Sequence, residues 1–253
     1  MKNNSGFLSL TKFEIRMMRR HLISICFWGL SFLWGNTQLA QAGVVFFDSV
    51  TTPHTPVYLK VLTKGLLFAE GGRLVDIYSE DQKLGRVLSG GDGYGFMKLT
   101  PTDAGLKTFI ARMDGHSDSA YLLVMKKTDR ALLFDIEVLS RTFLSKTARS
   151  DTQKALNILS KKFKLIYLTR LLGPSIAKKI IAKAELPASA VLPWQGPDLF
   201  EDLKSRQITL TAIIGSADIV SEAADDVPYR FTFEETEDET FVEDWQEIIK
   251  QLR

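Results

Sequence analysis

The chain has 253 residues, of which 45% are apolar and 25% charged, a composition typical of a folded globular protein. The formal net charge is +2, but residues 1–42 hold five basic groups and one acid, so residues 43–253 carry 27 basic and 29 acidic groups. This near-neutral balance argues against nucleic acid as a partner, since its recognition needs a basic stripe. Residues 43–253 contain no cysteine for a disulfide, and their two histidines, His54 and His116, are too few for a three-histidine zinc site.

Residues 1–42 have the three parts of a secretory signal in the right order. Arg16, Arg19 and Arg20 form a positive region, residues 22–34 an apolar run, and Ala40-Gln41-Ala42 a small-x-small cleavage site. The run is shorter than the ~20 residues that span a bilayer as a helix. We therefore expect cleavage after Ala42 and a periplasmic or secreted protein without a transmembrane segment; an uncleaved anchor is the alternative. Three methionines are alternative translation starts: Met1, Met17 and Met18.

Residues 43–129 show short runs of branched and aromatic residues between turn signals, which predicts an all-β sandwich. The expected strands are residues 57–62, 73–79, 83–88, 94–99, 106–112 and 120–126. The segment from Pro101 to Gly105 resembles the turn before a late strand of immunoglobulin-like domains. The glycine cluster SGGDGYG (89–95) lacks the Gly-Lys-Ser/Thr end of a phosphate loop and any following helix, so we expect a hairpin turn there.

After residue 130, within a second domain spanning 130–253, apolar strands alternate with helical patterns. This alternation predicts a parallel sheet with helices on both faces. The expected strands are 131–136, 165–168, 208–214 and 229–233. The expected helices are 151–162, one opened by Pro174, a short one ending at 201–205, 217–225 and 241–252. The acids of 234–239 indicate a solvated loop, and a metal site there is the less favoured interpretation.

Polar side chains follow the expected strands of this second domain, where ligands bind in open parallel sheets. The first strand leads into Asp135-Ile136-Glu137, so two carboxylates emerge together, and the second leads into Thr169-Arg170. Lys204 precedes strand 208–214, which leads into Gly215-Ser216-Ala217-Asp218. The sequence therefore predicts one polar cleft at the carboxyl edge of the sheet.

The order of these residues resembles the haloacid dehalogenase-like hydrolases, most closely the lipin-type phosphatidate phosphatases. Asp135-x-Glu137 stands where that family has Asp-x-Asp, and YLTRLLG (167–173) resembles the lipin segment Ser-Ala-Arg-x-x-Gly. The resemblance implies a Rossmann-like α/β domain with Asp135 as nucleophile and Glu137 as acid. It also implies that Thr169 holds the phosphoryl oxygens and that Lys204 steadies their charge. Three residues would then hold Mg²⁺: Asp135, Glu137 and Ser216.

The chain departs from this family in two places. Glu137 replaces an Asp, and Gly215-Ser216-Ala217-Asp218 replaces a Gly-Asp or Gly-Asn followed by a further acid, so any Mg²⁺ should bind weakly. One hypothesis is an exported phosphatase acting on a phosphorylated small molecule or lipid head group. A second is a degenerate phosphatase fold that binds without turnover, and a third is an envelope or adhesion scaffold that binds through its β domain. The candidate residues also have structural explanations: Asp135 as a strand end, Thr169 as a helix cap and Lys204 as a solvated lysine.

Overall fold

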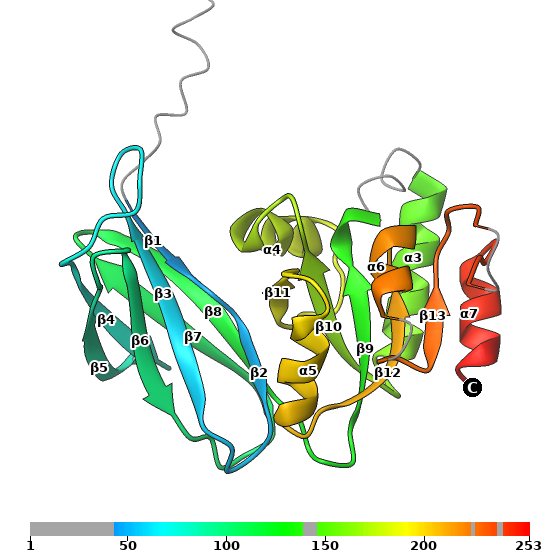
Figure 1. Cartoon of the computed structure of the whole chain (residues 1–253), viewed down its shortest axis with the longest axis horizontal. Coiled ribbons are helices and arrows are strands. Elements are labelled where there is room, and N and C mark those ends of the chain that lie inside the picture. The colour runs from blue at the N-terminus through cyan, green and yellow to red at the C-terminus, as the bar shows by residue number, and fades with distance from the viewer. Residues whose placement is uncertain (1–42, 139–145, 224–225, 237–239) are drawn as a thin grey trace, which may run out of the picture. The chain divides into compact units, whose positions relative to one another are not determined.

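The computed structural model describes residues 43–138, 146–223, 226–236 and 240–253 (Figure 1). The predicted signal and its cleavage site lie outside these residues. Within the described part of the chain, no helix is both long enough and apolar enough to cross a membrane. Residues 42–253 cluster as one unit, in which a β sandwich is followed by an α/β domain.

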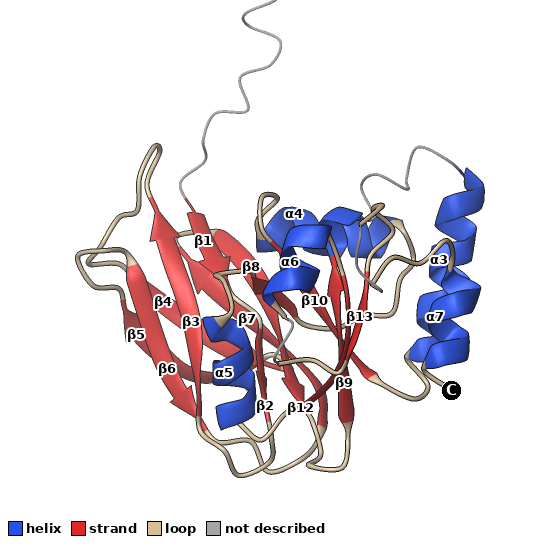
Figure 2. Ribbon diagram, turned by 45° about the vertical axis from the view of Figure 1, so that its right-hand side comes forward, coloured by secondary structure: helices blue, strands red, loops and turns tan. Residues whose placement is uncertain are grey.

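Two β sheets form the first half of this unit (Figure 2). One has the order β1-β3-β6, with β1 (Gly43–Phe46), β3 (Val57–Lys64) and β6 (Tyr94–Leu99). The other has the order β2-β8-β7-β4-β5, with β2 (Ser49–Thr51), β8 (His116–Val124), β7 (Gly105–Met113), β4 (Leu74–Ser79) and β5 (Gln82–Leu88). Neighbouring strands are antiparallel except that β2 runs parallel to β8. This is an immunoglobulin-like arrangement, as predicted.

Alternation along the strands explains why the sandwich forms. In β3, the side chains of Val57, Leu59 and Val61 are buried, and they join apolar residues of the second sheet in one core. The β7–β8 hairpin turns at Asp114-Gly115, both with positive φ, as a two-residue turn requires. The strands β1 and β2 were not predicted, because four and three residues are too few to show a period.

The hairpin predicted at the glycine cluster is wrong. Residues 89–93 connect β5 to β6, and these strands belong to different sheets, so the segment crosses from one sheet to the other. Gly93 in this segment and Gly71 in the β3–β4 loop let the two segments pack closely. A Cβ at Gly71 would lie 2.2 Å from the carbonyl oxygen of Gly90, and a Cβ at Gly93 would lie 2.9 Å from that of Thr63.

The second half is a five-stranded parallel sheet with the order β11-β10-β9-β12-β13. Its strands are β9 (Arg130–Asp135), β10 (Lys164–Thr169), β11 (Val191–Pro193), β12 (Thr209–Ile214) and β13 (Tyr229–Phe231). Its helices are α3 (Lys146–Leu159), α4 (Pro174–Lys183), α5 (Asp198–Ser205), α6 (Ala217–Glu222) and α7 (Trp245–Gln251). The predicted parallel alternation is confirmed, and β11 is an additional short strand.

β9 is central, and its side chains are buried from Ala131 to Asp135. Leu132 and Phe134 join the core with α3, α4 and α7, whereas Ala131 and Leu133 join the core with α5 and α6. The chain leaves β9 for β10 on one side and later returns to β12 on the other. Between β9 and β12 the strand order therefore reverses, which is where doubly wound sheets bind ligands.

Asp48, between β1 and β2, connects the sandwich to the α/β domain. Its fully buried carboxylate lies 2.7 Å from Nζ of Lys178 in α4, and it accepts the backbone N–H groups of Tyr121 and Val191, each at 2.8 Å. Burial raises the pKa of this carboxyl, and Lys178 and the two amides act in the opposite direction. Nearby, Val50 of β2 packs in the α/β core.

We expect Asp48→Ala and Lys178→Met each to lower the free energy of unfolding by about 3–5 kcal/mol. Lys178→Met leaves a buried carboxylate without its cation, and Asp48→Ala leaves two backbone N–H groups and a largely buried ammonium without their acceptor. The double variant should lose less than the sum of the two. Urea titration measures all three. Asp151 and Lys154, an exposed pair at 3.8 Å, provide the control, where Asp151→Ala should cost under about 1 kcal/mol. Additive effects at Asp48 and Lys178 would contradict the coupling.

Candidate functional site

Asp135 lies at the carboxyl end of β9, between the ends of its two neighbouring strands. Its side chain is buried, with Oδ1 accepting the backbone N–H of Glu137 at 2.9 Å and Oδ2 accepting that of Ser216 at 3.3 Å. A Cβ at Gly215 would lie 3.3 Å from that of Asp135, so glycine lets the end of β12 approach closely. The carboxylate is therefore fixed from both sides.

Burial and three neighbouring residues shift the pKa of Asp135. Burial is the largest effect and raises the pKa of its carboxyl, while the N–H groups of Glu137 and Ser216 lower it. The charge of Glu137 raises the pKa further, and Arg170 lowers it. Asp135 thus keeps its proton to a higher pH than an exposed aspartate.

The carboxylate of Glu137 reaches across to the segment that follows β10. Its Oε1 accepts the backbone N–H groups of Arg170 at 2.8 Å, of Leu171, and of Leu172 at 3.1 Å. The hydroxyl of Thr169 is 3.4 Å from the same oxygen. Successive N–H groups that converge on one point form an anion-binding nest. We call these donors of residues 169–172 the amide nest, and the chain's own Glu137 occupies it.

A cleft of about 160 Å³ opens beside these groups, lined in part by Asp135, Glu137, Arg170, Ser216 and Glu234. Arg170 pairs with Asp218 at 3.5 Å. The carboxylate of Glu234 accepts the N–H of Ala217 at 3.1 Å. The hydroxyl of Ser216 is buried and has no hydrogen-bond partner among the described residues.

The structure thus brings Asp135, Glu137, Thr169 and Ser216 to one edge of the sheet. Glu234 lies there too, although its sequence context indicated a solvated loop. The signal that would have found it is its position three residues after β13, whose carboxyl end meets the same edge as β9 and β12.

The prediction that Lys204 reaches the cleft is wrong. Its Nζ lies 2.6 Å from Asp226. Both residues come shortly before strands begin, Lys204 before β12 and Asp226 before β13. In a parallel sheet the amino ends of strands share the edge opposite to the carboxyl ends, so this pair lies away from Asp135. Residue order along the chain did not distinguish the two ends of α5.

The predicted magnesium ligands do not form a metal-binding set. Both oxygens of Asp135 accept backbone N–H groups, and Glu137 directs Oε1 at the amide nest. Nowhere in the described residues do three or more His, Cys, Asp or Glu side chains gather in a way that would hold a metal ion. The structure thus engages both carboxylate oxygens of Asp135 and Oε1 of Glu137 with backbone N–H groups, and weak Mg²⁺ binding stays a prediction.

No family model and no curated protein matches the chain. Among solved structures, it is similar to the D00-D0 domain of intimin at 14% identity and a TM-score of 0.31, covering 36% of this chain and 51%, about half, of that one. It is similar to an IG27 protein domain at 11% identity and a TM-score of 0.28, and the match covers 34% of this chain and 98% of that domain. Fibronectin(III)-like modules of CbhA from Clostridium thermocellum match at 14% identity and a TM-score of 0.25, and the match covers 33% of this chain and 97% of that one. At these scores, no conclusion about the cleft rests on the similarities.

Proposed function

We propose that the α/β domain is a phosphatase-like fold without turnover and that the protein acts outside the cytoplasm as a binding module. The observation that carries this proposal is the occupation of the amide nest by Glu137. In a phosphatase of the kind that the sequence resembles, those donors would receive the phosphoryl oxygens. Here a phosphate would first have to displace a carboxylate that is covalently part of the chain and always present.

Two further features support a loss of catalysis. Lys204 pairs with Asp226, and Arg170, a cation that lines the cleft among the described residues, pairs with Asp218. The cleft of about 160 Å³ is also smaller than the roughly 300–1,000 Å³ of typical small-molecule sites. A phosphorylated small molecule or a lipid head group would therefore meet little space and few available donors.

A slow phosphomonoesterase is the second candidate. Asp135 stands at the strand end where a nucleophile would be. The buried hydroxyl of Ser216, which has no partner in the described part of the chain, is a donor that a bound anion could use. This candidate requires Glu137 to leave the amide nest. Weakly bound Mg²⁺ stays a prediction, and no step is assigned to it because the described side chains do not assemble its ligands.

We expect the purified protein to hydrolyse phosphomonoesters no faster than its Asp135→Asn variant, with or without Mg²⁺, because Glu137 blocks the oxygen-binding donors. Release of inorganic phosphate from a small aryl phosphate and from phosphatidate measures this. Turnover that Asp135→Asn abolishes would overturn the proposal in favour of the second candidate.

Removing the carboxylate should convert the amide nest into an anion site. We expect Glu137→Ala to cost about 1–3 kcal/mol, since it leaves backbone donors unsatisfied. Inorganic phosphate should then restore stability, by about 2.7 kcal/mol at a hundred times its Kd. Thermal unfolding across a phosphate series reports both effects. Glu201→Ala, at an exposed position of α5, is the matched control and should show no phosphate response. An equal response of both variants would show that the nest does not receive the anion.

A further inference from the structure

Three consecutive large apolar side chains project from the loop between β3 and β4. Leu66, Leu67 and Phe68 are 64%, 78% and 80% exposed. We call these residues the apolar tip. Leu74 and Leu88, which pair across β4 and β5 close to the base of the same loop, are also exposed. Contiguous apolar surface of this kind marks an interaction site in a folded protein.

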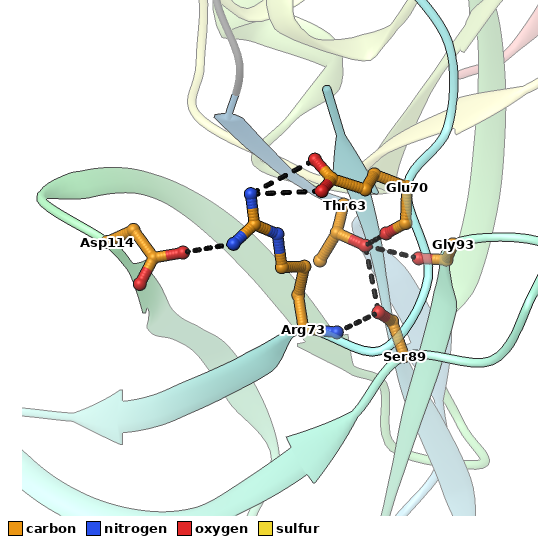
Figure 3. A network of polar contacts seen from close by, with 6 residues as sticks. All are labelled: Thr63, Glu70, Arg73, Ser89, Gly93 and Asp114. Atoms are coloured by element: carbon orange, nitrogen blue, oxygen red, sulfur yellow. Dashed lines mark hydrogen bonds and ion pairs between the residues drawn. The ribbon is translucent and has the colours of Figure 1, made fainter.

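The loop below the apolar tip is held by a polar network (Figure 3). The buried hydroxyl of Thr63 lies near the carbonyl oxygen of Glu70 and 2.9 Å from the hydroxyl of Ser89. Arg73 pairs with Glu70 at 3.1 Å and with Asp114 at 3.4 Å. A backbone bond of 2.8 Å from the N–H of Gly65 to the carbonyl of Phe68 closes the turn. The base thus presents the apolar tip in a fixed conformation, which lowers the entropic cost of binding.

The chain enters the sandwich beside the apolar tip. Gly43, where the described structure begins, pairs with Lys64, the residue two positions before Leu66. Only residues 35–42 separate Gly43 from the apolar run of residues 22–34, and eight residues span at most ~28 Å when extended. In the precursor, before the cleavage expected after Ala42, the apolar run is therefore tethered to the end of the sandwich that carries the apolar tip.

The tip suits a lipid surface better than a protein partner. A stable protein interface buries about 800 Å² on each side, more than three projecting side chains supply. A bilayer, in contrast, accepts a short protrusion of leucine and phenylalanine below its head groups. The exposed Lys64 beside the tip would attract anionic head groups, while Arg73 offsets the charges of Glu70 and Asp114.

We propose that Leu66, Leu67 and Phe68 dock the sandwich on a lipid membrane, with Lys64 facing anionic head groups. This docking proposal adds to the proposed function the surface that binds, the apolar tip, and the partner that it binds, a lipid membrane. It rests on the proposed function only in assuming that the protein lies in the cell envelope. Turnover in the cleft would overturn the proposed function and leave the docking result intact.

The test compares the purified protein with a variant carrying Leu66→Ser, Leu67→Ser and Phe68→Ser. We expect this variant to sediment with phosphatidylglycerol vesicles at least tenfold less. A control triple, Ile158→Ser, Ile176→Ser and Tyr229→Ser, removes three exposed apolar side chains elsewhere and should stay within twofold of the parent. Lys64→Gln should weaken binding to anionic vesicles and not to phosphatidylcholine vesicles.

If residues 22–34 remain attached, they could bind vesicles themselves and mask the effect of the serine substitutions. Tryptophan fluorescence at the apolar tip measures insertion of the tip directly. Phe68→Trp should add an emission component that shifts to the blue with vesicles and is quenched by brominated lipid. Tyr229→Trp should show neither change. An unshifted Phe68→Trp signal would overturn the proposal. So would serine variants that alter self-association, measured by sedimentation velocity, while vesicle binding stays unchanged.

Discussion

The buried carboxylate of Asp48 is the interaction on which the arrangement of the described chain depends. Taking an ion out of water is costly unless its partners replace the lost solvent. Asp48 obtains those partners from three elements, the ammonium of Lys178 in α4 and amides of Tyr121 in β8 and Val191 in β11. Any slip between the sandwich and the parallel sheet would separate the charge from its donors. Val50 and Met125 also pack in the core that contains Ala131 and Leu133 of β9. These apolar contacts therefore require the same placement of the sandwich against the parallel sheet as the contacts of Asp48.

On a much smaller scale, the side chain of Glu137 determines which group occupies the amide nest. Glu137 is longer than the aspartate expected at its position, and its carboxylate therefore reaches the amides after β10. The donors that would have made the site receptive are satisfied from within the protein. A cleft of about 160 Å³ remains beside these groups, but the converging N–H groups at its edge already bind Glu137. The chain itself therefore supplies the anion that the amide nest binds.

Short sequence patterns predicted the features that depend on neighbouring residues. The continuous apolar run of β9 predicted a buried parallel strand, and the alternation in β3 predicted a strand of the sandwich. The pairing of Asp48 with Val191 joins residues 143 positions apart, which no local pattern encodes. Lys204 was misplaced because chain order does not say which edge of the sheet a helix end faces. The convergence of Asp135, Glu137 and Thr169 was predictable, since parallel neighbours share an edge; the capture of the amides by Glu137 depends on one rotamer.

The position of Asp48 early in the chain has a consequence for folding. The first strands of the sandwich are synthesised long before Lys178 and Val191, so the buried carboxylate lacks most of its partners until the parallel sheet is nearly complete. Contacts of such large sequence separation slow folding, because a long loop must be closed before they contribute. A sandwich that formed alone would leave the carboxylate of Asp48 without Lys178 and Val191, so we expect it to reach full stability only together with the parallel sheet.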